Sequence, residues 1–248
     1  MFQRKYILKK QIPNLITALN LLSGIVATIM AVEGRYEEAA IFVALGIFFD
    51  FFDGLAARLL DVASPLGVQL DSLADMVTSG LVPGIVLFKL IDEALTKGSS
   101  EFFISAETHY LAYIGFVVTV ASAYRLAKFN IDERQTSSFI GLPTPANTLL
   151  ILSFPIIAIY QPEHFLASAA QSSYFLIALS FISAYLLNSN YHLFALKFKS
   201  LQFKENLFRY LLVMGSILLL VIFKFAGIPF IILLYILLSI AKEAKEKK

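Results

Sequence analysis

The chain has 248 residues, of which 58% are hydrophobic and only 15% are charged. A soluble domain of this length has about half apolar and about a quarter charged residues, so the composition excludes an ordinary soluble protein. The absence of cysteine excludes disulfides and thiolate chemistry. The histidines His109, His164 and His192 are far apart in the sequence, so we expect no histidine metal cluster.

Apolar stretches of about 20 residues, long enough to cross a bilayer, recur along the chain, and the short alternating strands typical of a transmembrane barrel do not. We therefore predict an all-α polytopic membrane protein with about eight transmembrane helices. We see no internal repeat, so we expect residues 1–248 to form a single membrane domain, with its catalytic core at about 13–160 and additional helices at about 173–241. The predicted spans are 13–32, 38–60, 67–90, 110–130, 144–160, 173–189, 207–224 and 228–241.

The distribution of basic residues predicts the orientation in the membrane. Both ends of the chain, MFQRKYILKK and AKEAKEKK, are basic, and an even number of spans puts them on the same side. Sixteen of the 20 Lys and Arg then share that side, and four, Arg35, Lys89, Lys97 and Lys224, lie on the other. Because cytoplasmic loops carry an excess of Lys and Arg, we expect both termini to be cytoplasmic.

Three connections between the spans have a distinct composition. Residues 91–109 form the longest polar connection on the outer side, and residues 225–230, FAGIPF, are expected to form a tight hairpin between the last two helices. Residues 190–206 are basic and aromatic. They fit either an interfacial helix on the anionic inner leaflet or a plain inner loop.

The stretch DFFDGLAARLLDVASPLGVQLDSLAD, from Asp50 to Asp75, carries five aspartates. Asp50 and Asp53 are three residues apart in one predicted span, and Asp71 and Asp75 are four apart in the next, so each pair shares a helix face. The short connection DVASPL makes the two helices antiparallel neighbours, and we expect these four carboxylates to converge. Asp61 falls in that connection and is expected to be solvated.

Converging carboxylates in a membrane need positive charge beside them. A charged side chain at the bilayer centre costs about 2.5–3.5 kcal/mol on insertion scales, and Arg58 supplies only one positive charge. A divalent cation is the natural source of the remaining positive charge. Carboxylates without histidine or cysteine nearby favour Mg²⁺ or Mn²⁺. The alternatives are hydrated residues at a membrane edge or the proton or cation pathway of a transporter.

Small residues accompany the acids. Gly54 follows Asp53, Ala57 lies three residues further on, and Gly67 precedes Asp71 by one helical turn. In membrane helices small residues usually allow close packing. Their position beside the carboxylates also suits a bulky ligand that carries phosphate.

The pattern DxxDGxxAR, eight residues, then GxxxDxxxD, from Asp50 to Asp75, resembles the defining motif of the CDP-alcohol phosphotransferase family at every motif position. Members of this family transfer a phosphate-bearing group from a CDP-linked lipid or alcohol to a hydroxyl group and release CMP. The resemblance implies two divalent cations, Mg²⁺ or Mn²⁺, and identifies Asp75 as the general base. It implies that the metals are held by Asp50, Asp53, Asp71 and Asp75.

The resemblance also implies a pocket for the CDP-linked lipid. In the first span, PNLITALNLLSG places Asn14, Thr17 and Asn20 on one helix face. Ordinary helix-start chemistry after Pro13 explains such residues, but family members have polar residues here near the nucleotide. The residues predicted to form the CDP-lipid pocket are Asn14, Thr17, Gly54, Ala57, Arg58 and Gly67.

The stretch YRLAKFN, at the inner end of the fourth predicted span, bears on the acceptor. Lys128 fits a snorkelling anchor at the inner surface, whereas Arg125 lies deeper and could receive an anionic acceptor. Together, RLAKFN and GLPTPA after LDSLAD are similar to the membrane-integral phosphatidylserine synthase branch of the family. That similarity implies CDP-diacylglycerol and L-serine as substrates, with Arg125, Lys128 and Asn130 at the acceptor site.

Other acceptors and functions remain open at the level of the sequence. Glycerol 3-phosphate or an inositol phosphate would use the same chemistry, and Arg134 adds a third nearby cation. A cation transporter would use the aspartates but would leave Arg58 unexplained, and a structural scaffold would leave the acids unexplained. The family resemblance also leads us to expect a homodimer in the inner membrane of a prokaryote, contacting membrane lipids and no nucleic acid.

Overall fold

The computed structural model describes residues 2–98, 107–132, 138–195 and 202–246. Its elements are mainly helices, with one two-stranded sheet. They are α1 (Phe2–Val32), α2 (Tyr36–Leu59), α3 (Pro65–Asp75), the π-helix η1 (Met76–Leu81), α4 (Val82–Gly98), α5 (Glu107–Ala112), the 3₁₀-helix η3 (Tyr113–Phe116), α6 (Val117–Ile131), β1 (Ser138–Ile140), α7 (Thr144–Tyr160), α8 (Phe165–Ala169), α9 (Ser173–Asn188), β2 (His192–Phe194), α10 (Phe203–Phe223), the 3₁₀-helix η4 (Lys224–Ala226) and α11 (Gly227–Glu246).

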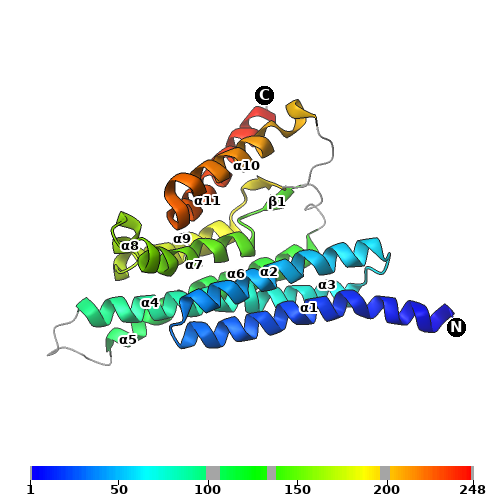
Figure 1. Ribbon diagram of the computed structural model, residues 1–248, viewed down its shortest axis with the longest axis horizontal. Helices are drawn as coiled ribbons and strands as arrows, with labels where there is room; N and C mark the ends of the chain where they lie inside the picture. Colours follow the sequence, from blue (N-terminus) through cyan, green and yellow to red (C-terminus); the bar gives the residue numbers. More distant parts are fainter. Residues whose placement is uncertain (1, 99–106, 133–137, 196–201, 247–248) are drawn as a thin grey trace.

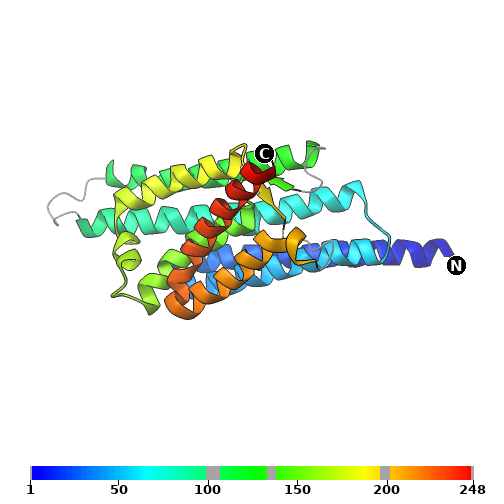
Figure 2. The same ribbon diagram turned by 90° about the horizontal axis from the view of Figure 1, so that it is seen from above.

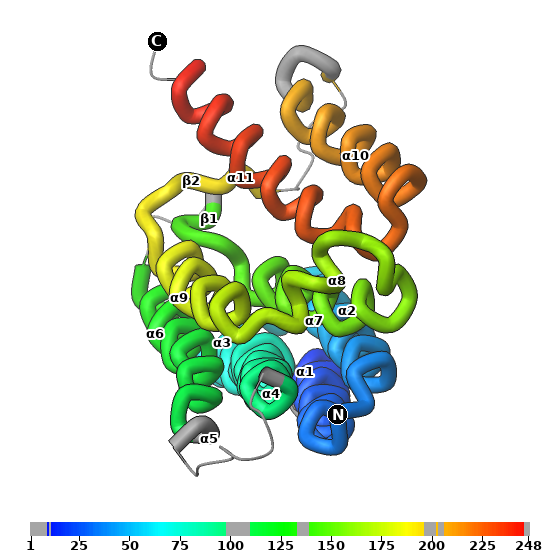
Figure 3. Tube along the Cα trace, turned by 90° about the vertical axis from the view of Figure 1, so that its left-hand side faces the viewer, coloured from blue at the N-terminus to red at the C-terminus, as the bar shows by residue number. Residues whose placement is uncertain are grey.

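The helices form layers (Figures 1 and 3). The long helices α1, α2, α4 and α6 lie side by side in one layer, and α7 and α9 cover one face of it. The hairpin of α10 and α11 lies on top of α7 and is inclined to the helices below, as the view from above shows (Figure 2). The centre of the bundle is α4, whose Val86, Leu87 and Ile91 are fully buried.

Local sequence signals explain how α2 leads into α3. Ser64 is the N-cap of α3, and its Oγ accepts a hydrogen bond from the backbone N–H of Gly67 at 3.1 Å. Pro65 occupies the first helical position, where its missing N–H costs no hydrogen bond. The connection is therefore short and capped, and it turns α3 back alongside α1. Asp61 in this connection is exposed, as predicted, and has a φ of 52°.

The apolar helices support a membrane protein. Five helical stretches of the described chain are long and apolar enough to cross a bilayer. The last, Asn206–Lys245, doubles back at η4 into two packed helices, so the predicted hairpin is present and turns slightly earlier than FAGIPF. Two further apolar helices, Thr144–Tyr160 and Ser173–Asn188, have only 17 and 16 residues and are shorter than these five stretches. The count of eight spans therefore stays a prediction.

Two expectations about the connections were wrong in detail. Residues 91–98 continue α4 rather than starting a polar loop. The described chain is mainly helical, which is consistent with the predicted all-α class, and two three-residue strands, β1 and β2, pair antiparallel. The strand β2 replaces a helix or plain loop at the start of the 190–206 segment. A short helix, α8, also forms in the connection after α7. Residues 99–106 and 196–201 lie outside the described part of the chain.

Candidate active site

Three of the four motif carboxylates form a close group. Asp50 and Asp53 lie in the last part of α2, and Asp71 and Asp75 lie in α3. Asp50, Asp53 and Asp71 each offer an oxygen atom that lies within 4.8 Å of the other two. Asp75 is outside this group of three, one helical turn beyond Asp71.

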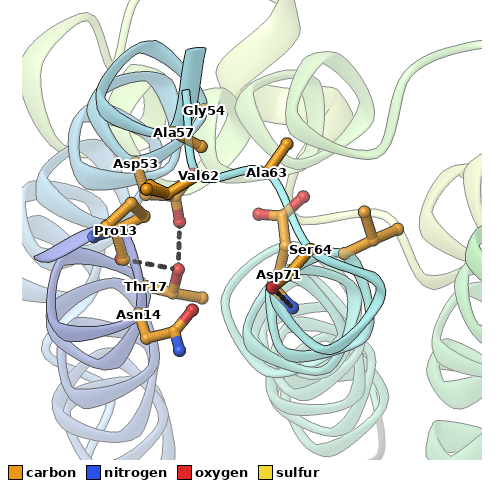
Figure 4. Close-up of a pocket in the computed structure, with 12 residues that line it drawn as sticks. Pro13, Asn14, Thr17, Asp53, Gly54, Ala57, Val62, Ala63, Ser64 and Asp71 are labelled. Atoms are coloured by element: carbon orange, nitrogen blue, oxygen red, sulfur yellow. Dashed lines mark hydrogen bonds between the residues drawn. The ribbon is translucent and has the colours of Figure 1, made fainter. Parts of the chain in front are cut away.

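A hydrogen bond from α1 orients one of these carboxylates. Thr17 Oγ1 donates to Asp53 Oδ2 at 2.5 Å and lies 3.1 Å from the carbonyl oxygen of Pro13 (Figure 4). Both Thr17 and Asp53 are buried, at 5% exposure. Asp71 lies across the pocket from this pair. Thr17 thus fixes the Oδ2 atom of Asp53 and leaves the other carboxylate oxygen for a ligand.

A second chain of hydrogen bonds from α1 reaches Asp75. The hydroxyl of Thr78 donates to Asn20 Oδ1 at 2.8 Å, so the amide nitrogen of Asn20 faces the other way and donates to Asp75 Oδ1 at 3.2 Å. Thr78 and Asn20 are fully buried. Thr78 lies in η1, the π-helical turn that follows Asp75 directly.

Two glycines permit this arrangement. A Cβ at Gly46 would lie 2.6 Å from Thr78 Cγ2 and 2.9 Å from Asn20 Oδ1. A Cβ at Gly24 would lie only 3.0 Å from the Cα of Thr78 and would collide with its hydroxyl. The backbones of α1 and α2 therefore approach η1 so closely that no other residue fits without a shift.

A cavity of about 110 Å³ opens between α1, α2 and α3 beside Asp53 and Asp71 (Figure 4). Five of the six residues predicted to contact the CDP-lipid line it: Asn14, Thr17, Gly54, Ala57 and Gly67. A Cβ at Gly54 would meet no atom within 4 Å, so the space beside this glycine is open. Arg58, the sixth, is exposed and is not part of the lining.

The predicted acceptor residues divide into two sets. Arg125 is buried at 7% exposure, and its Nε has no hydrogen-bond partner among the described residues. Its guanidinium is within electrostatic reach of Asp75 and of Tyr235. Lys128 lines the same small cavity as Arg125. Asn130 instead faces α3, where Ser72 Oγ donates to its Oδ1 at 3.1 Å.

The sequence did not assign a role to three polar residues, Asn20, Asn147 and Tyr235. Asn20 shares the helix face of Asn14 and Thr17, and this three-residue spacing could have indicated that Asn20 belongs to the site. Asn147 is fully buried, and both polar atoms of its amide have no partner among the described residues. Tyr235 reaches the site from α11, far away in sequence, and no local pattern marks it.

The oxygen atoms of Asp50, Asp53 and Asp71 fit a divalent metal. Asp50 and Asp71 are close enough to share a hydrogen bond, and Asp71 Oδ1 is buried with no partner among the described residues. Two carboxylates in contact need a proton or a cation between them. The donor set holds only oxygen, which hard cations such as Mg²⁺ and Mn²⁺ prefer.

Comparison with known proteins identifies the family. The family model described as CDP-alcohol phosphatidyltransferase matches residues 10–188, which is most of the chain and includes all four motif aspartates. The chain belongs to the CDP-alcohol phosphatidyltransferase family. The family resemblance of the motif is thereby confirmed, and α10 and α11 lie beyond the matched residues.

Several curated proteins are similar to this chain. A CDP-diacylglycerol–serine O-phosphatidyltransferase of Bacillus subtilis is 34% identical over 149 residues, which is 58% of this chain and 75% of that protein. One of Helicobacter pylori is 30% identical over 56% of this chain and 55% of its own length. An archaetidylserine synthase of Methanothermobacter thermautotrophicus is 26% identical over 60% of both chains. The match thus spans between about half and three quarters of these relatives.

Proposed function

We propose that this protein transfers the phosphatidyl group of CDP-diacylglycerol to the hydroxyl of L-serine and gives phosphatidylserine and CMP. The observation that carries the proposal is the group of three motif carboxylates beside the cavity of α1, α2 and α3, in a chain of this family. The names of the similar proteins support CDP-diacylglycerol and serine as the substrates.

Asp50, Asp53 and Asp71 hold divalent metal in this proposal, and Asp75 completes the ligand set that the motif implies. Two bound Mg²⁺ or Mn²⁺ ions would neutralise the pyrophosphate and stabilise the charge that develops on it. The chain itself holds the metal-binding carboxylates in fixed positions. Thr17 holds Asp53, and the short capped connection after α2 brings Asp71 to it.

Asp75 is the proposed base. The serine hydroxyl oxygen attacks the phosphorus of the phosphatidyl group, the bond from that phosphorus to the CMP oxygen breaks, and CMP leaves with the electron pair. Asp75 accepts the hydroxyl proton. Asn20 occupies one oxygen of Asp75 by donating to Oδ1, so Asn20 fixes the carboxylate and leaves Oδ2 for the proton.

The cavity beside Asp53 suits the CDP group. Gly54 leaves open space where a side chain would project, so phosphate groups can approach the backbone of α2. Asn14 offers an amide from α1 and lies within the lining. Arg58, at the exposed end of α2, would have to turn inward to contact phosphate, and we propose that it does so only when the nucleotide is bound.

Arg125 and Lys128 suit an acceptor that carries a carboxylate. They line one small cavity, and Arg125 is within electrostatic reach of Asp75, so an acceptor held there by its anionic group would place its hydroxyl toward the base. Two cations in one cavity would also receive a phosphate. Glycerol 3-phosphate, or an inositol phosphate, is therefore the second candidate acceptor.

Acceptor-dependent release of CMP tests the proposal. Purified protein with CDP-diacylglycerol and Mn²⁺ should release CMP when L-serine is added, and a chelator should stop the release. Release with glycerol 3-phosphate but not with serine would overturn the choice of acceptor and keep the metal site. Cation flux through liposomes without any release of CMP, in folded protein, would favour a transporter.

The arrangement in the membrane is also a proposal. We propose that both termini and the carboxylate end of the bundle face the cytoplasm of a prokaryote, across its inner membrane, because the basic residues gather there. We propose a homodimer as the working assembly on the family resemblance alone. Membrane lipids would contact the exposed apolar faces of the long helices.

A further inference from the structure

A large cavity lies between α9 and α11, away from the cavity beside Asp53. Its volume is about 590 Å³, and it is lined by the end of α9, the residues that follow, and the last turns of α11. Tyr185, Asn190, Tyr191 and Glu243 give this space, which we term the vestibule, a polar lining. Asn190 and Tyr191 are exposed, so the vestibule is open to the surroundings.

The vestibule adjoins the cavity of Arg125 and Lys128. Asn188 and Ser189 line both spaces, and we term these two residues the constriction. The inner cavity has a volume of only about 10 Å³, which is about the space that a single water molecule needs. The constriction is therefore closed to an amino acid in this structure and separates two spaces that both contain polar side chains.

Buried polar atoms without partners mark the inner side of the constriction. Asn188 Oδ1 and Arg125 Nε both lack a hydrogen-bond partner among the described residues. A buried polar group without a partner destabilises the folded protein, so water or a ligand is expected there. Asn188 is anchored only through its amide nitrogen, which donates to the carbonyl oxygen of Ala121 at 3.0 Å.

Arg125, which lines the inner cavity, is also electrostatically coupled to the proposed base. The guanidinium of Arg125 is within electrostatic reach of Asp75. No residue is common to the lining of the vestibule and that of the cavity beside Asp53. One wall of the vestibule belongs to α11, which lies beyond the residues matched by the family model. The nucleotide and the acceptor would therefore approach Asp75 from different sides.

We propose that a small polar acceptor with a carboxylate group reaches Asp75 through the vestibule, passing the constriction of Asn188 and Ser189. This inference rests on the proposed function and adds the route of the second substrate. Arg125 and Lys128 attract the carboxylate from the inner side. The constriction must widen for each acceptor molecule and then excludes bulk water from the reacting phosphate.

The absence of cysteine from the chain allows a direct test with single cysteines. Ser189→Cys places a thiol at the constriction, and Ala244→Cys places one on the vestibule wall of α11. Each variant is treated with a cationic thiosulfonate reagent, and its kinetics before and after treatment are compared. We expect modification to lower kcat/KM for L-serine by about tenfold or more and to leave KM for CDP-diacylglycerol unchanged.

Protection of the thiols from the reagent is the second measurement, and it does not need turnover. L-serine should slow the modification of Ser189→Cys, whereas CDP-diacylglycerol should not. The matched control is Ala63→Cys, an exposed alanine that lines the other cavity. At this position CDP-diacylglycerol should protect and L-serine should not. The unaltered chain, treated with the same reagent, controls for effects away from cysteine.

The two measurements separate a wrong route from a wrong function. Modification at both vestibule positions with no change in kinetics for L-serine would overturn the route, as would protection of Ala63→Cys by L-serine. If no acceptor supports CMP release, the proposed function fails. Protection of Ser189→Cys by L-serine would even then support the route, and absence of protection would overturn it.

Discussion

Side chains from α1 hold two of the four motif aspartates. Thr17 donates to Asp53, and Asn20 donates to Asp75. An Asp side chain can adopt several rotamers and has few partners in an apolar bundle. Each of these two hydrogen bonds therefore determines where the other oxygen of its carboxylate points. The first helix therefore helps to set the geometry of the site, together with the two helices that carry the motif.

Replacement of Asp71 by Asn should abolish turnover and the response to metal. Asp71 shares the group of three carboxylates and has a buried oxygen without a partner. Even groups outside the ligand shell cost about 10–100-fold when lost, so we expect a loss of at least about a hundredfold. Mn²⁺ should raise the Tm of the unaltered protein, because a ligand that binds only the folded state stabilises it.

The matched control is Asp61→Asn. Asp61 is an exposed aspartate of the same sequence stretch, and its φ of 52° is one that Asn tolerates. It should keep both turnover and the Tm increase with Mn²⁺. Equal Mn²⁺ responses in Asp71→Asn and the unaltered protein would show that the metal does not bind at Asp71.

Asp75→Asn separates the base from the binding of substrate. Asn cannot accept the hydroxyl proton, so we expect turnover to fall by about 10²–10⁴-fold. Binding of CDP-diacylglycerol should be partly retained, because the cavity beside Asp53 is not lined by Asp75. Turnover and equilibrium binding of the lipid nucleotide are measured on the same sample. Turnover close to that of the unaltered protein would show that another group accepts the proton.

At the scale of elements, the π-helical turn η1 is the feature that connects the motif to α1. Thr78 in this turn donates to Asn20, which in turn donates to Asp75. Thr78→Val keeps the shape of the side chain and removes the donor, so the amide of Asn20 loses its orientation. We expect kcat to fall by about 10–100-fold with KM for both substrates nearly constant, and Thr78→Ser should restore most of kcat. An equal loss in Thr78→Ser would assign Thr78 to packing alone.

Glycines in α2 should respond differently to alanine according to what they face. At Gly54 a Cβ would enter open space, whereas at Gly46 it would lie 2.6 Å from Thr78 Cγ2. Gly46→Ala should lower stability by about 1–3 kcal/mol, as overpacking does. Gly54→Ala should leave the Tm unchanged or raised and increase KM for CDP-diacylglycerol. Thermal unfolding in detergent and steady-state kinetics distinguish the two, and unchanged KM in Gly54→Ala would remove this glycine from the nucleotide site.

The sequence predicted the features that depend on local spacing. Asp50, Asp53 and Asp71 converge because each aspartate pair shares a helix face and the connection between the helices is short. The sequence could not predict η1, because a π-turn arises from how its neighbours pack. It also missed the pairing of β1 with β2, which are far apart in the chain. The acceptor role of Asn130 stays a prediction, and the sequence did not predict that Asn130 accepts a hydrogen bond from Ser72 of α3.

For the whole molecule, the orientation in the membrane is a prediction from the distribution of charge. Single cysteines at Glu33, in the turn after α1, and at Ala63, in the connection after α2, place exposed thiols at opposite ends of α2. A membrane-impermeant thiol reagent added to intact cells should label Glu33→Cys at once and Ala63→Cys only after the membrane is permeabilised. The reverse pattern would invert the orientation and place the carboxylates outside.

Transfer of radiolabelled L-serine into lipid tests the central claim most directly. Purified protein in liposomes that contain CDP-diacylglycerol, with Mn²⁺, should convert the label into a lipid in amounts equal to the CMP released. A chelator, or Asp71→Asn, should prevent the transfer. Folded protein that releases CMP without labelled lipid, or that forms labelled lipid equally well in the presence of chelator, would contradict the account of metal-dependent transfer to serine.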